Sequence, residues 1–141
     1  MLESLSLDGR VIVITGGGTG LGLAMVRALA RAGANLCIAG RRPGPIDDAA
    51  SEVREIGREA LAVPTDISDS AQVDRLMSQT VEHFGQIDVL INNAALVSSN
   101  VRKPIWEITD AEWRQAMDVN LGGAFYCSRA AAKPMADRGQ G

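Results

Sequence analysis

Residues 15–22 read T-G-G-G-T-G-L-G and follow directly on the apolar run V-I-V-I of residues 11–14. This order predicts a buried strand, a tight turn and a helix that begins at about Gly20. Glycine allows close approach of the backbone and a positive φ in such a turn. The N-terminus of the helix offers unpaired N–H groups and a partial positive charge to a phosphate. The stretch therefore predicts a dinucleotide-binding turn, with a tight strand–helix corner that binds no ligand as the alternative.

The composition is that of an ordinary globular domain. The 141 residues are 46% apolar and 22% charged, with a net charge of −3 and no basic stripe, so nucleic acid is not an expected partner. No apolar run approaches the roughly 20 residues of a membrane span, and the N-terminus lacks the pattern of a secretory signal. Cys37 and Cys127 are not spaced as metal ligands. We therefore expect a cytoplasmic protein with two reduced, buried thiols, no metal site and no membrane contact.

Strand-like and helix-like stretches alternate along the chain. Strands are predicted over residues 10–15, 35–39, 60–65 and 87–91, and helices over residues 20–32 and 45–57. A third helix follows a capping box of Asp69 and Gln72 and ends at Gly85. A second capping box, Thr109 with Glu112, opens a long helix to about residue 136, which Pro134 should kink or end. Nearly continuous apolar strands joined by helices imply an α/β fold of the Rossmann type, a doubly wound parallel sheet.

The second strand ends in Gly40-Arg41-Arg42, where many NAD-binding folds place an acidic residue. Two guanidinium groups are suited to a 2′-phosphate, so this region favours NADP, with NAD as the alternative cofactor. The arginines could instead lie in a solvated loop and pair with Asp47 or Asp48.

Polar residues also follow the third and fourth strands. Asp66 could accept the adenine amino group or cap the following helix. Asn93 could tie adjacent strand ends together and touch the cofactor, or it could close the strand in an Asx turn. Small alanines beside it would let the cofactor approach.

The long helix contains three poor helix formers, Asn120, Gly122 and Gly123. They predict a distortion, in which Asn120 could hold a water at an active site. Close helix packing through the glycines is the alternative. Trp106 and Trp113 are expected to be packing residues.

Together these residues resemble the short-chain dehydrogenase/reductase family over nearly the whole chain. The resemblance rests on Thr15-Gly16-x-x-x-Gly20-x-Gly22, Asp66, Asn92-Asn93-Ala94 and Asp118-Val119-Asn120. It implies a sheet in the strand order 3-2-1-4, a nicotinamide cofactor, and hydride transfer between NADP(H) and a small carbonyl or alcohol substrate. It also implies that Asn120 is a catalytic residue in a proton relay. The cofactor-binding residues would be Gly16, Gly18, Thr19, Gly20, Leu21, Gly22, Arg41, Arg42, Asp66, Ile67, Asn93, Ala94 and Ala95.

The chain departs from the family pattern in two ways. Ala95 stands where the family usually has glycine, as in branches that act on enoyl- and dienoyl-CoA thioesters. The family's catalytic Ser and Tyr-x-x-x-Lys are missing, because they would follow Gly141. We therefore expect residues 1–141 to be the N-terminal, NAD(P)-binding portion of a longer single-domain enzyme. The portion by itself would be inactive and its fold incomplete at the C-terminus, and the parent would be a homodimer or homotetramer. The alternative is a non-catalytic nucleotide-binding module.

Overall fold

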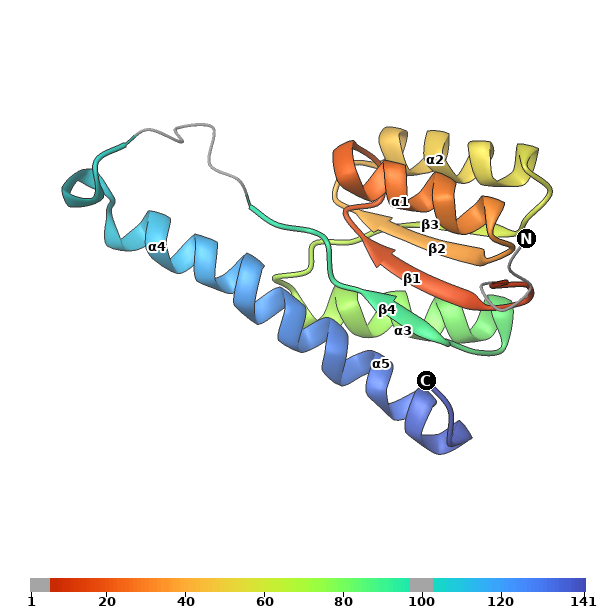
Figure 1. The fold of residues 1–141 in the computed structure, drawn as a ribbon. Coiled ribbons are helices and arrows are strands. Elements are labelled where there is room, and N and C mark those ends of the chain that lie inside the picture. The colour runs from red at the N-terminus through yellow and green to blue at the C-terminus, as the bar shows by residue number, and fades with distance from the viewer. Residues whose placement is uncertain (1–5, 97–102) are drawn as a thin grey trace.

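The computed structural model describes residues 6–96 and 103–141 (Figure 1). Its centre is a four-stranded sheet in the order β3-β2-β1-β4, in which every neighbouring pair is parallel. The strands are β1 (Val11–Thr15), β2 (Asn35–Gly40), β3 (Ala60–Pro64) and β4 (Val89–Ile91). The predicted α/β fold and strand order are thus confirmed. Pro64 lies on an edge strand, as a residue without a donor N–H should.

Helices cover both faces of the sheet (Figure 1). On one face lie α1 (Gly20–Arg31) and α2 (Pro43–Glu55), and on the other lie α3 (Ser70–Phe84) and α5 (Ala124–Arg138). Successive strand residues point to opposite faces, so β1 serves two cores. Ile12 and Ile14 belong to the core beneath α1 and α2, whereas Val13 belongs to the core with α3 and α5.

The long helix is distorted where the sequence predicted. The short turn η2 (Ile105–Glu107) precedes α4 (Asp110–Met117), and the π-helical segment η3 (Asp118–Gly123) joins α4 to α5. Pro134 does not end the helix, which continues to Arg138. Proline removes only one hydrogen bond from the ladder. The last turn is also held from outside, because the Arg138 guanidinium donates to the Ile87 carbonyl and the Asp88 carboxylate.

Two local expectations were wrong. Asp69 caps α3 by accepting from the amides of Ala71 and Gln72, but the Gln72 side-chain oxygen accepts from the Asp66 amide instead of the Asp69 amide. The capping box is therefore only half formed, in contrast to the complete box of Thr109 and Glu112. Trp106 and Trp113 are exposed, because η2 and α4 extend away from the sheet. Among the described residues, no helix is both long enough and apolar enough to cross a membrane.

Candidate functional site

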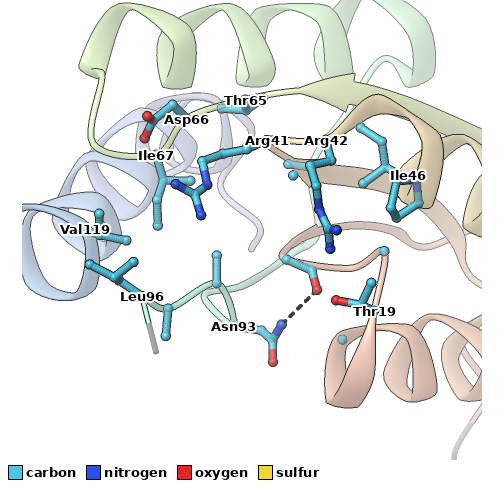
Figure 2. Close-up of a pocket in the computed structure, with 18 of the residues that line it drawn as sticks. Thr19, Arg41, Arg42, Ile46, Thr65, Asp66, Ile67, Asn93, Leu96 and Val119 are labelled. Atoms are coloured by element: carbon cyan, nitrogen blue, oxygen red, sulfur yellow. Dashed lines mark hydrogen bonds between the residues drawn. The ribbon is translucent and has the colours of Figure 1, made fainter. Parts of the chain in front are cut away.

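A cavity of about 670 Å³ lies at the carboxyl ends of the four strands (Figure 2). Parallel sheets of this kind bind ligands at that edge. The cavity is lined by Gly16, Gly18, Thr19, Leu21, Gly22, Ala39, Gly40, Arg41, Arg42, Pro45, Ile46, Thr65, Asp66, Ile67, Asn93, Ala94, Ala95, Leu96 and Val119. The lining includes every predicted cofactor residue except Gly20, which begins α1 with φ +55°. The fold therefore brings together residues that are separated by about 80 positions in the chain.

The glycine turn allows two backbone segments to meet at one wall of this cavity. Gly16 has φ +69°, and a Cβ there would lie 3.0 Å from the Ala94 Cα. A Cβ at Gly22 would overlap the Gly16 carbonyl oxygen. Thr19 precedes α1 but its side chain caps no amide, and the first turn of α1 carries no acidic side chain. The N-terminus of α1 therefore keeps its positive end for an anion at the cavity.

Arg41 and Arg42 add full positive charges to the cavity at the end of the neighbouring strand β2. Both side chains line the cavity (Figure 2), and Arg42 is the residue that precedes α2. Within residues 6–96 and 103–141, neither arginine forms a salt bridge. The alternative pairing with Asp47 or Asp48 is therefore not formed. An anion in this part of the cavity would meet two guanidinium groups that are suited to bind a phosphate.

Asp66 is fixed in the cavity wall by its own loop. Its Oδ1 accepts from the Ser68 amide at 3.0 Å and from the Ser68 hydroxyl at 2.7 Å. Its amide donates to the Gln72 side chain at 2.9 Å. Because Asp69 caps α3, Asp66 is not the helix cap.

Asn93 ties the ends of β1 and β4 together. Its Nδ2 donates to the carbonyl oxygens of Thr15 at 3.0 Å and Gly16 at 3.2 Å. The Thr15 hydroxyl in turn accepts from the amides of Asn93 and Ala94. The predicted tie between strand ends is thus present, and the buried Thr15 side chain is a partner that the sequence analysis missed.

Asn120 does not line the cavity but fixes a segment that does. Its Oδ1 accepts from the Leu96 amide at 2.6 Å, and its Nδ2 donates to the Leu96 carbonyl oxygen at 3.3 Å. Leu96 and Val119, the neighbour of Asn120, both line the cavity. The side chain therefore couples η3 to the segment that follows β4.

Sequence reasoning missed seven lining residues: Ala39, Gly40, Pro45, Ile46, Thr65, Leu96 and Val119. Ala39, Gly40 and Thr65 lie at strand ends and could have been found from the rule that ligands bind there. Val119 stands in the quoted motif Asp118-Val119-Asn120, but neither it nor Leu96 was expected at the cavity, because the distorted helix and its bond to Leu96 bring them there. Among the described residues no group of acidic, His and Cys side chains could hold a metal ion.

Comparisons with known proteins agree with this geometry. A family described as short chain dehydrogenase matches residues 10–141. An uncharacterized oxidoreductase of Thermotoga maritima is 39% identical over 96% of this chain and 52% of its own length. Galactitol 2-dehydrogenase of Rhizobium johnstonii is 35% identical over 94% of this chain and 51% of its own length.

A solved structure supports the same likeness. The crystal structure of NAD+-bound xylitol dehydrogenase superposes with a TM-score of 0.91 at 27% identity, over 96% of this chain and 51% of that one. The chain thus spans about half the length of the relatives it matches.

Proposed function

The chain belongs to the short-chain dehydrogenase family, and from that membership we propose that it is the dinucleotide-binding part of an NADP(H)-dependent oxidoreductase. The substrate is a small alcohol or carbonyl compound. Oxidation of the alcohol would require a hydride acceptor for its carbon and a base for its hydroxyl proton. The nicotinamide supplies this hydride chemistry, and the residues of this chain bind and orient the cofactor.

The cavity residues divide this work by their chemistry. The glycine turn and the N-terminus of α1 would hold the pyrophosphate. Arg41 and Arg42 would hold the 2′-phosphate. Asp66 and Ile67 would hold the adenine, and the residues from Asn93 to Ala95 would line the remainder. These residues suit a dinucleotide, because the cavity is lined both by anion-binding groups and by an apolar wall.

The observation that carries the cofactor assignment is the pair Arg41 and Arg42 beside a strand end without an acid. Gly40 ends β2, so no carboxylate stands at the end of that strand to repel a 2′-phosphate or to bind a 2′-hydroxyl. The dinucleotide in the xylitol dehydrogenase structure is NAD+, which makes NAD the competing assignment.

Binding measurements distinguish the two cofactors. Calorimetry with 2′,5′-ADP and 5′-ADP should show tighter binding of the ligand with the 2′-phosphate, because a hydrogen bond to a charged group contributes about 1.5–3 kcal/mol, or roughly 10–100-fold. Arg41→Ser and Arg42→Ser should each remove most of this difference. Arg114→Ser replaces an exposed arginine outside the cavity and is the matched control. Equal affinities would favour NAD, and no binding of either ligand would contradict a dinucleotide site.

Proton transfer needs residues that this stretch does not contain. Tyr126 is the single tyrosine, and Ala130 stands four residues after it, so there is no Tyr-x-x-x-Lys within residues 1–141. We therefore propose that these residues are the N-terminal portion of a longer enzyme and bind cofactor without turning over substrate alone. Asn120 would support the relay by fixing Leu96 and η3. The alternative, a non-catalytic nucleotide-binding module, would bind the cofactor equally well. An alcohol oxidation assay of the encoded protein distinguishes an enzyme from such a module.

The long helix carries an exposed apolar stripe. Trp113, Leu121 and Phe125 lie at spacings of four and eight along α4, η3 and α5, and all three are exposed. Exposed apolar stripes of this kind indicate a protein interface. We propose that this stripe joins copies of the protein in a homodimer or homotetramer, located in the cytoplasm.

A further inference from the structure

The π-helical segment η3 contacts the cavity wall through a residue without a side chain. Gly123, the last residue of η3, is buried. A Cβ at this position would lie 2.5 Å from the Cδ1 and 2.6 Å from the Cγ1 of Ile67. Carbon atoms in favourable contact are about 3.5–4.0 Å apart. The backbone of η3 therefore lies so close to Ile67 that a Cβ at position 123 would require the Ile67 side chain or η3 to shift.

The neighbouring Gly122 has room for a side chain. A Cβ at Gly122 would meet the Met117 carbonyl oxygen at 3.7 Å and the Tyr126 ring at 3.8 Å, which are ordinary contacts. An added methyl group at Gly122 is therefore accommodated, whereas the same group at Gly123 would require η3 or the Ile67 side chain to move. The two glycines form a natural matched pair, because both lie in η3 and carry a similar difference in helix propensity from alanine.

This contact sets the distance between two cavity walls. Ile67 lines the cavity next to Asp66, and Val119 lines it from η3. Figure 2 shows Ile67, Val119 and Leu96 at the same end of the cavity. Asn120, three residues before Gly123, holds Leu96 by two hydrogen bonds. A displacement of η3 from Ile67 would therefore move Val119 and loosen the Asn120–Leu96 pair together.

The helix behind the contact has little room to adjust. Cys127 and Ala131 continue the buried side of α5 at spacings of four from Gly123, and both are fully packed in the core with Leu76 and Met77 of α3. Protein interiors are close-packed and resist the insertion of a methyl group. The displacement is therefore expected in η3, whose backbone already departs from the α-helix.

We propose that Gly123 and Ile67 are positioning residues of the nucleotide cavity. Their contact holds η3 so that Val119 forms the apolar wall beside Asp66 and Asn120 bonds to Leu96. The inference rests on the proposed function, in which this end of the cavity receives an adenine.

The test compares Gly123→Ala with Gly122→Ala in the protein as encoded. Affinity for 2′,5′-ADP is measured by calorimetry, and exchange of the Leu96 amide is measured by NMR. Gly123→Ala should weaken binding on the order of tenfold or more, because small displacements of positioning groups have large effects. It should also speed exchange at Leu96, whose amide donates to Asn120. Gly122→Ala should leave both quantities within about twofold of the original.

A rescue experiment separates the contact from general destabilisation. Ile67→Ala removes the Cδ1 and Cγ1 atoms that a Cβ at position 123 would meet. In that background, Gly123→Ala should cause a smaller loss of affinity and of Leu96 protection than it causes alone. If Gly123→Ala alone fails to fold, folding should return in the double variant.

Equal effects of the two glycine substitutions, no effect of either, or strictly additive effects with Ile67→Ala would overturn the inference. If the unsubstituted protein binds neither 2′,5′-ADP nor NADP, the proposed function fails instead. The exchange of the Leu96 amide then still decides whether the contact positions η3.

Discussion

At the residue scale, Asp88 shows how one buried carboxylate can hold several elements together. It lies just before β4, with a side chain only 4% exposed. It accepts from the Val11 amide at 2.8 Å, from the Arg138 guanidinium at 2.7 Å and from Arg10 at 3.2 Å. These donors come from β1, from the end of α5 and from the residue before β1. Asp88 therefore connects two strands and the last helix at the edge of the sheet opposite the cavity.

The surroundings of Asp88 also determine its protonation. Burial by itself raises the pKa of Asp88, but hydrogen bonds from the Val11 amide, Arg138 and Arg10 outweigh this effect and lower the pKa below the ordinary value of 3.8. A lowered pKa in the folded state means that the ionised carboxylate stabilises the fold. This stabilisation is complete above the unfolded pKa and is lost as the pH falls through the lower folded pKa.

Asp88→Asn should therefore reduce the free energy of unfolding by about 1.5–3 kcal/mol at neutral pH, the range for hydrogen bonds to charged groups. The difference in free energy of unfolding between the two proteins should become smaller in acid, because the unsubstituted protein then loses the same contribution. Urea denaturation across a pH series measures both effects. Asp137→Asn, which removes an exposed ion pair with Lys133 from the same helix, should change the stability little. A pH-independent deficit for Asp88→Asn would contradict this account.

At the element scale, α4 is fixed at its N-terminus by a capping box that also recruits a lysine. Thr109 accepts from the Glu112 amide at 3.2 Å, and the Glu112 carboxylate accepts from the Thr109 amide at 2.8 Å. Lys103 donates to both carboxylate oxygens of Glu112, at 2.8 Å and 3.0 Å. The start of α4 is thus tied to a residue six positions before the cap.

These contacts predict the ionisation of Glu112. Hydrogen bonds from Lys103 and from the Thr109 amide and hydroxyl lower the pKa of Glu112 to about 2. An NMR pH titration of the Glu112 side chain should show this value. Lys103→Ala should raise the pKa of Glu112 towards its ordinary value of 4.5, since it removes the largest contribution. Because the folded pKa is lowered, the interaction stabilises α4 at all pH values above the unfolded pKa. A Glu112 titration unchanged by Lys103→Ala would show that the capping box acts alone.

The elements also show where local sequence signals are reliable. Capping signals at Thr109 and Asp69 placed the starts of α4 and α3 correctly, because a cap acts within a few residues. The hydrogen-bond partner of the Gln72 side chain could not be predicted from the local sequence, because the amides of Asp66 and Asp69 are both nearby. In the structure the Asp66 amide donates to it. Pro134 does not end the helix, which continues to Arg138, whose guanidinium bonds the last turn to Ile87 and Asp88.

At the scale of the whole molecule, the exposed apolar stripe on the long helix predicts assembly. Trp113, Leu121 and Phe125 leave apolar area in water that a second copy could cover. Phe125→Asp should therefore shift the protein from oligomer to monomer in sedimentation equilibrium, because it places a charge in the proposed interface. The cavity should be unaffected, since Phe125 does not line it.

A control variant separates this effect from added charge. Gln115→Asp introduces the same side chain at an exposed polar position of α4 and should leave the oligomeric state unchanged. A monomeric original protein, or equal dissociation by both variants, would contradict the proposed interface.

The site could be predicted from sequence wherever its residues lie at the carboxyl end of a strand. The turn from Gly16 to Gly22, the arginine pair and Asp66 all follow predicted strands, and parallel strands bring those ends to one edge. Val119 and Leu96 were not predictable in this way, because one lies in a distorted helix and the other in a segment without periodicity.

The sequence by itself determined the order of strands and helices, the parallel sheet and the edge of the sheet at which the cavity lies. These features follow from hydrophobic periodicity, capping and the handedness of strand–helix–strand connections, which act over short stretches of chain. Only the tertiary structure decided the hydrogen-bond partners of the polar side chains: Asn93 with Thr15, Asn120 with Leu96, and Asp88 with Arg138. It also decided that an added Cβ would overlap a neighbouring side chain at Gly123 but not at Gly122. Such choices depend on distances between segments far apart in sequence, and those distances are set only when the two cores pack.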